Sequence, residues 1–129
     1  MSGHKRDPNH TVEVQPTTRE VHVAVDGRTI ARTRRALALS ETGYPVRYYI
    51  PPDDVRMELL EPTERTSVCP YKGRASYWSV RVDGRVVDNA VWAYLDPIPQ
   101  CAAIKGHLSF YPEKVELKVA DQAARVIAP

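Results

Sequence analysis

Short stretches in which hydrophobic and polar residues alternate recur along the chain, and this period of two predicts β-strands. In residues 21–31, two such stretches flank an Asp-Gly dipeptide. Asp-Gly favours a two-residue hairpin turn, because both turn positions need positive φ. Residues 80–87 repeat the phrase V-x-V-D-G-R, so a second hairpin is expected. The repeat indicates either an internal duplication or two separate uses of a favoured turn.

The hairpins also predict which residues face one another. Counting back from a two-residue loop places Val23 opposite Ile30 in the first hairpin. The same count in the second hairpin places Trp78 opposite Asn89. Trp78 and Trp92 are therefore expected on opposite faces of the sheet.

The remaining pattern completes a mainly β prediction of about eight or nine short strands in a single domain. Further strands are expected over residues 36–39, 46–50, 88–94, 106–111 and 115–119, with an edge strand over 11–14. Residues 61–67 are interpreted as a loop. One short helix is predicted near 53–60, capped by Asp53 or Asp54. The predicted organisation is a flexible segment over 1–18, the β domain over 19–119 and a tail over 120–129.

Composition and charge narrow the classes of function. The 129 residues carry a net charge of +2, which is too small an excess to indicate a nucleic-acid partner. Arg32, Arg34, Arg35 and Arg47 lie among scattered acidic residues, so a solvated face is the favoured interpretation. No run reaches the roughly 18 apolar residues of a membrane span. The polar start and two widely spaced cysteines predict a cytoplasmic protein with reduced thiols.

Residues 69–78 concentrate candidate chemistry, with a thiol, a lysine, a serine and three aromatic rings in ten residues. A thiolate near a cation becomes nucleophilic, which makes Cys69 and Lys72 candidate catalytic residues. The alternative is a buried structural cysteine with the lysine directed to solvent. A composite metal site from Cys69, Cys101 and His107 is conceivable, but the chain has no local ligand pair, so no metal is expected.

Several phrases together resemble one known family. They are E-T-G at 41–43, Y-Y-I-P-P-D-D-V at 48–55, C-P-Y-K-G at 69–73, A-S-Y-W at 75–78, W-A-Y-L-D-P at 92–97 and F-Y-P at 110–112. The chain is similar, over residues 20–119, to the domain of unknown function 427 family. This resemblance implies a β-tent fold, whose better-known members usually hold zinc with two Cys-x-x-Cys pairs.

The chain departs from those zinc-binding relatives, because it contains no Cys-x-x-Cys pair. We therefore expect no zinc and no cofactor. The family is sometimes labelled nucleotidyltransferase-like, but the chain has neither a G-x-G-x-x-G motif nor a P-loop pattern. The resemblance thus implies the fold and leaves the reaction open.

The predicted ligand-binding residues combine charged groups at strand ends with aromatic rings. They are Glu41, Arg47, Tyr49, Asp54, Lys72, Tyr77, Trp92 and Asp96. The carboxylates can act as acids or bases in a pocket. Each also has a structural alternative: a helix cap for Asp54, a turn for Asp96 and an ion pair with Arg47 for Glu41. Tyr77 and Trp92 are expected to share one face of the sheet.

The predicted function is binding of an unknown small polar or planar ligand in an aromatic-walled pocket. One alternative is an enzyme with Cys69 as nucleophile or redox thiol. Another is a protein-interaction module that uses the outer strand at 115–119. Packing of the rings as ordinary core is the competing structural explanation.

Overall fold

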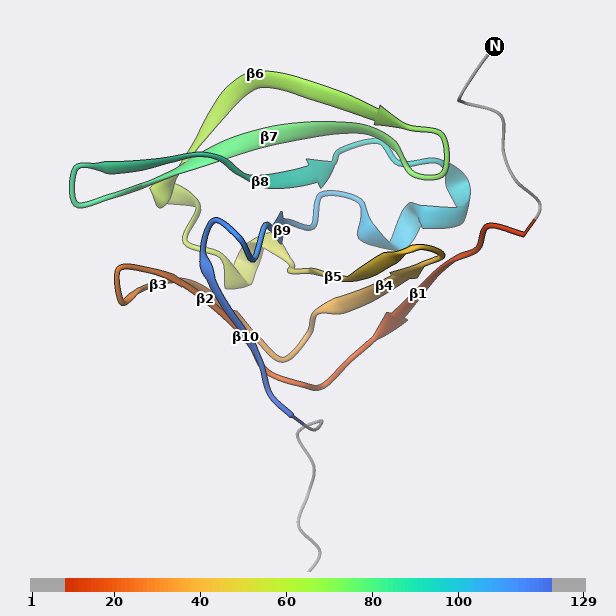
Figure 1. Ribbon diagram of the computed structural model, residues 1–129, viewed down its shortest axis with the longest axis horizontal. Coiled ribbons are helices and arrows are strands. Elements are labelled where there is room, and N and C mark those ends of the chain that lie inside the picture. Colours follow the sequence, from red (N-terminus) through yellow and green to blue (C-terminus); the bar gives the residue numbers. More distant parts are fainter. Residues whose placement is uncertain (1–8, 122–129) are drawn as a thin grey trace, which may run out of the picture.

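The computed structural model describes residues 9–121, which fold into three antiparallel sheets (Figure 1). One sheet has the order β1-β4-β5 and contains β1 (Val12–Pro16), β4 (Leu37–Glu41) and β5 (Tyr44–Tyr49). A second has the order β10-β2-β3 and contains β10 (Glu116–Val119), β2 (Val21–Val25) and β3 (Arg28–Thr33). The largest has the order β6-β7-β8-β9 and contains β6 (Leu60–Cys69), β7 (Gly73–Val82), β8 (Arg85–Tyr94) and β9 (Ser109–Phe110).

The long β7–β8 hairpin supplies both halves of the core. In Figure 1 this hairpin lies above the two smaller sheets. Val80 and Val82 belong to the larger buried cluster, which also contains residues of β2 and β3. Tyr77 and Trp92 belong to a second cluster with residues of β4 and β5. Alternate residues of one hairpin therefore pack in different clusters, and the second, ring-rich cluster adjoins the candidate site.

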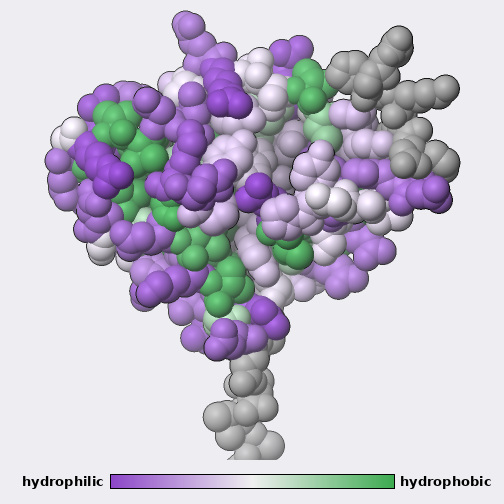
Figure 2. Space-filling model, viewed as in Figure 1, coloured by the Kyte–Doolittle hydropathy of each residue, from purple (hydrophilic) through white to green (hydrophobic). Residues whose placement is uncertain are grey.

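The surface is mostly polar, as expected for a small domain whose apolar residues fill two clusters. Figure 2 shows hydrophilic residues over most of one face, with apolar residues between them in a band across its left half. No helix among residues 9–121 has the length and apolar character needed to cross a membrane.

The predicted register of the first hairpin is wrong beyond the turn. Val23 pairs with Ala31, not with Ile30, because a β-bulge shifts the register between Val23 and Ala24. The bulge leaves Ile30 as an extra residue on β3. Both Ile30 and Ala31 are buried, at 0% and 1% exposure. A regular strand would turn one of two successive side chains toward solvent.

A larger irregularity in the second hairpin sets the register of the site. Trp78 pairs with Val91, not with Asn89, because the pairing shifts between Trp78 and Val80. Asn89 adopts a φ of +49°, and its backbone N–H donates to the hydroxyl of Ser79 at 3.0 Å. The shift is by two residues, so alternation is preserved and Trp78 and Trp92 pack in different clusters as predicted.

Residues 61–67 form most of strand β6, so their assignment to a loop was wrong. This strand is an edge strand that pairs only with β7, and its pairing is irregular between Pro62 and Thr66. Proline is tolerated on an edge strand because no neighbour needs its missing N–H. A polar edge strand of this kind lacks the apolar alternation that sequence reasoning relies on.

The helical content near 53–60 is two 3₁₀ turns, η1 (Pro52–Asp54) and η2 (Met57–Leu59). Val55 between them is extended and bridges to Ala31, which prevents one continuous helix. No side chain caps either turn, so the predicted Asp cap is absent. A third turn, η3 (Pro99–Ile104), was not predicted.

The predicted edge strand near the N-terminus is confirmed as β1, which pairs with β4. The segment assigned to 1–18 therefore contains part of the folded domain from residue 12 onward. Residues 1–8 and most of the predicted tail lie outside the described residues.

Candidate functional site

A cavity of about 330 Å³ opens between the ring-rich cluster and the start of the β7 strand. Rings from β5, β7, β8 and the chain just after β9 wall it, and charged side chains from β4, β5 and the 69–73 turn reach it. The predicted site residues that line it are Glu41, Arg47, Tyr49, Cys69, Lys72, Tyr77 and Trp92. Most of the residues selected from the sequence are therefore brought together around one hollow.

The inner wall is built on the pairing of β7 with β8. Tyr77 lies directly opposite Trp92, so the two side chains share one face of the sheet, as predicted. The indole N–H of Trp92 donates to the hydroxyl of Tyr49 at 3.1 Å. Burial raises the pKa of Tyr49 well above its ordinary value, so this phenol is neutral throughout the physiological range.

Two further tyrosine hydroxyls lie near the cavity mouth. The Tyr77 hydroxyl is 2.9 Å from the hydroxyl of Ser67. The ring of Tyr111 lies 4.3 Å from that of Trp92, between centroids. Burial, followed by a hydrogen bond with Tyr77, raises the pKa of Tyr111 to about 12. The Tyr111 hydroxyl is therefore protonated at neutral pH and can donate a hydrogen bond.

Glu41 joins two basic side chains that sequence reasoning did not connect. One carboxylate oxygen pairs with the Lys72 amine, and the other accepts from His10 Nε2 at 2.8 Å. The side chains of Glu41 and Lys72 are only 6% and 12% exposed. Lys72 is therefore an anchored, partly buried cation, and the alternative in which it points to solvent is wrong.

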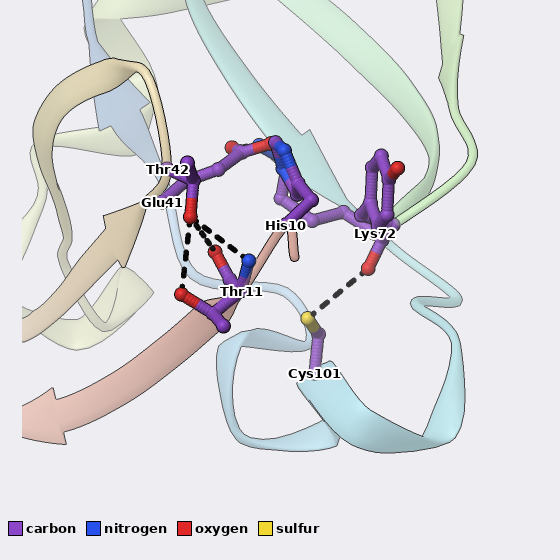
Figure 3. Close-up of polar contacts among 7 residues, drawn as sticks. His10, Thr11, Glu41, Thr42, Lys72 and Cys101 are labelled. Carbon is purple, nitrogen blue, oxygen red and sulfur yellow. Dashed lines mark hydrogen bonds and ion pairs between the residues drawn. The ribbon is translucent and has the colours of Figure 1, made fainter. Parts of the chain in front are cut away.

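The chain ahead of β1 holds His10 in this position. The His10 ring stacks on that of Tyr71 with 4.0 Å between centroids. The next residue, Thr11, is tied to Thr42 by a backbone N–H to hydroxyl hydrogen bond of 2.9 Å. Figure 3 shows His10 and Thr11 beside Glu41 and Thr42, in front of the segment that carries Cys101. These contacts place the imidazole against the carboxylate.

Arg47 lies against the aromatic wall rather than beside an acid. Its guanidinium carbon is 5.4 Å from the ring centroid of Trp92 and 5.7 Å from that of Tyr111. No ion pair among residues 9–121 includes Arg47. The predicted alternative pairing of Glu41 with Arg47 is therefore wrong.

Among the described residues neither cysteine forms a disulfide, but the surroundings of the two thiols differ. Cys69 lines the cavity and is half-buried. Cys101 is 1% exposed, and its thiol donates to the backbone oxygen of Tyr71 at 3.5 Å. Only Cys69 has the access that a reactive thiol requires.

The match to known sequences follows the boundaries of this fold. A sequence profile of the family described as Domain of unknown function (DUF427) matches residues 13–121. The chain belongs to this family. The matched range runs from β1 to just beyond β10, so the DUF427 domain includes all three sheets and the cavity described above. A search of the curated proteins found no match to the chain.

Two predicted ligand-binding residues of this DUF427 domain lie outside the cavity. The Asp54 carboxylate accepts from the Thr33 hydroxyl at 2.6 Å and from Arg35 at 3.1 Å. These hydrogen bonds lower its pKa, and they give Asp54 a structural role. Asp96 is exposed beyond the end of β8, and the cavity lining does not include it.

Sequence reasoning missed His10 as a site residue, because it placed residues 1–18 outside the domain. His10 and Glu41 are 31 residues apart, and no local motif links them. The predicted alternation over 11–14 was the available signal, since that strand carries the chain to the site.

The described residues offer no ready metal centre. No group of three or more His, Cys, Asp and Glu side chains within residues 9–121 is arranged to hold a metal ion. Cys69, Cys101 and His107 therefore do not form the composite site considered from the sequence. The imidazole of His107 instead lies 3.1 Å from the backbone oxygen of Lys105.

A second hollow of about 390 Å³ lies along β3 and η1. Its lining contains no aromatic ring, and its residues include Arg32 and Asp54. Both of these charges have partners, Glu20 for Arg32 and Arg35 for Asp54. This hollow therefore has fewer of the features of a small-molecule site than the ring-walled cavity.

Proposed function

We propose that the DUF427 domain binds a small polar or planar molecule in the cavity beside Tyr77 and Lys72. The observation that carries this proposal is the convergence of six rings and three charged side chains on one hollow. Cavities of roughly 300–1,000 Å³ with aromatic walls and a few polar groups are typical of small-molecule sites. The volume of about 330 Å³ suits a ligand at the small end of this range.

The Glu41–Lys72 pair gives the proposal a second physical basis. Desolvating two charges costs free energy that their attraction does not always recover, so a nearly buried ion pair is a poor device for stability. At the edge of a cavity the same pair offers an oriented ammonium and carboxylate. A polar ligand that displaces water there meets groups already fixed in position.

A thermal-shift screen with a metabolite library tests the proposal, because a ligand of the native state raises the melting temperature. Val68 lines the cavity and is 60% exposed, so Val68→Trp narrows the opening without removing a core residue. Val86, a 40% exposed valine near the other end of the β7–β8 hairpin, provides the matched control Val86→Trp.

Compounds that bind in the cavity stabilise wild type and Val86→Trp but give a reduced shift with Val68→Trp. Equal shifts in all three proteins place the ligand elsewhere and reject the cavity. A broad library without a single stabilising compound argues against small-molecule binding.

The exposure of Cys69 to the same cavity favours a second candidate function, an enzyme in which this thiol is the nucleophile. Its test is the rate of alkylation by iodoacetamide at neutral pH. A rate well above that of a free-thiol model supports an activated thiolate. A rate equal to that model or slower rejects this candidate.

The interaction-module alternative rests on the edge position of β10 in the β10-β2-β3 sheet. The part of the N-terminal segment that forms β1 pairs with β4 and not with β10. An unpaired strand edge can accept a strand from another chain. We retain the predicted cytoplasmic location as a proposal, because neither cysteine forms a disulfide among the described residues. We also propose that the three sheets form the β-tent that the family resemblance implies.

A further inference from the structure

Cationic side chains gather around the rings at the mouth of the cavity. The Arg47 guanidinium lies 5.7 Å from the ring centroid of Tyr111, and the Lys114 amine lies 5.9 Å from it. The guanidinium of Arg65 stands 4.7 Å from the ring centroid of Tyr77. Three positive groups from three segments of the chain thus surround two neighbouring phenols.

These cations lack acidic partners within the described part of the chain. None of the ion pairs among residues 9–121 includes Arg47, Arg65 or Lys114. The Lys114 amine donates to the backbone oxygen of Asp88 at 2.8 Å, which leaves its charge uncompensated. The acid of the cavity, Glu41, already has Lys72 and His10 as partners. The mouth therefore carries an excess of positive charge.

This arrangement decides between two kinds of ligand that aromatic walls can bind. Rings with free faces attract cations, as in the cages that bind quaternary ammonium groups. Here Arg47 and Lys114 lie near the faces of Tyr111, and Arg65 lies over Tyr77. A cationic ligand would be repelled by these groups, whereas an anion would be attracted.

The geometry of Arg47 suits it to hold that anion. A guanidinium stacked on rings loses little freedom on binding, and its N–H edges remain able to donate. Such an edge binds a carboxylate or a phosphate through two parallel hydrogen bonds. The hydroxyls of Tyr77 and Tyr111, which line the same cavity, are further groups able to donate hydrogen bonds to a ligand.

Building on the proposed function, we propose that the ligand is a planar organic anion. Its carboxylate or phosphate binds Arg47, and its aromatic or heteroaromatic ring lies against the walls formed by Tyr77 and Trp92. Carboxylate and phosphate share the chemistry that Arg47 recognises, and the two are separated by the probes below.

Isothermal titration calorimetry with four small probes tests this proposal at low ionic strength. Phenyl phosphate and benzoate are the anionic probes, benzamide is the neutral match and benzylammonium is the cationic one. We expect an anionic probe to bind on the order of tenfold more tightly than benzamide, as a charge-assisted hydrogen bond predicts. Benzylammonium is expected to bind more weakly than either. The ratio of phenyl phosphate to benzoate affinity identifies the preferred anion.

Arg47→Gln removes the charge and should reduce binding of the anionic probes by about tenfold or more. Arg34→Gln, at an exposed arginine on the chain after β3, is the matched control and should leave the affinity unchanged. Arg47→Lys keeps the charge but not the double hydrogen bond, so an intermediate affinity is expected. Near-ultraviolet circular dichroism verifies that each variant is folded, and Arg65→Gln provides a second test if Arg47→Gln unfolds.

The outcomes separate the failure of this inference from failure of the proposed function. If benzamide or benzylammonium binds as tightly as the anions, and Val68→Trp weakens that binding, the preference for an anion is overturned but binding in the cavity is upheld. Equal losses in Arg47→Gln and Arg34→Gln overturn the assignment to Arg47. Absence of binding by all four probes to the folded protein overturns the planar anion, whereas the library screen with Val68→Trp decides the cavity itself.

Discussion

Replacing Lys72 with methionine should destabilise the protein far more than an equivalent change at a surface ion pair. The variant keeps an unbranched apolar side chain but removes the amine. Glu41, 6% exposed, is then left with His10 as its remaining partner. A buried carboxylate that has lost its cationic partner raises the free energy of the folded state.

The magnitude follows from burial. Removing one partner of a buried ion pair costs about 3–5 kcal/mol, and we take the lower end because His10 still bonds Glu41. The expected loss is therefore about 3 kcal/mol. The control is the pair of Arg81 with Glu61, in which both side chains are 55% exposed. Arg81→Met should cost between about 0 and 1 kcal/mol.

Equilibrium urea unfolding measures both losses. With a slope of roughly 1–3 kcal/mol per molar urea for a small protein, Lys72→Met should lower the midpoint by about 1–3 M. The double variant Glu41→Gln, Lys72→Met removes the orphaned charge and should recover a large part of the loss. Similar small shifts for Lys72→Met and Arg81→Met would refute the argument that the Glu41–Lys72 pair is buried and coupled. Additive losses in the double variant would refute it as well.

Further predictions concern pH and backbone conformation. Hydrogen bonds from Arg35 lower the pKa of Asp54 in the folded state, so Asp54→Asn should cost about 1–2 kcal/mol at pH 7. That difference from wild type should disappear as the pH falls below about 4 and through the folded-state pKa, as urea unfolding at several pH values would show. The raised pKa of Tyr111, about 12, stabilises the fold below the ordinary tyrosine value of about 10, and this contribution is lost as the pH rises toward 12. Tyr111→Phe should therefore show a flatter decline in melting temperature over that alkaline range, and an unchanged decline would contradict the assignment. A Cβ on Gly73, which has a φ of +121°, would lie 3.3 Å from two backbone atoms, whereas one on Gly43 meets nothing within 4 Å. Gly73→Ala should therefore lower stability by about 1 kcal/mol more than Gly43→Ala in chemical denaturation, and equal losses would show that the backbone adjusts freely.

The hairpins show how far local patterns reach. Asp-Gly turns and alternating valines were enough to identify β2–β3 and the turn end of β7–β8, where Val80 pairs with Val87 as counted. Those signals act over a few residues, because turn type and side-chain direction depend on local φ and ψ. Beyond the turns the count failed at the bulge near Asn89. There Thr63 of β6 donates to the Asn89 side chain of β8 at 2.6 Å, although β7 lies between these two strands in the sheet, and no local pattern contains that contact.

The site divides in the same way. Residues 69–78 and the resemblance at 92–97 directed attention to Cys69, Lys72, Tyr77 and Trp92, and all four line the cavity. The chemistry of each side chain could be predicted from its residue type. The compensation of each charge could not be predicted, because Lys72 contacts Glu41, and Arg47 contacts the rings, only through packing between sheets.

The amino-acid sequence by itself determined the β class, the two tight turns, the family and the set of reactive side chains, since these depend on residue type and short-range geometry. Tertiary structure alone decided that His10 contacts Glu41 and that Asp54 pairs with Arg35. It also left Arg47 without an acidic partner among residues 9–121. The reason is physical: a charge is compensated by whatever group lies within a few ångströms of it. In a fold of three sheets, those groups come from strands that are far apart along the chain.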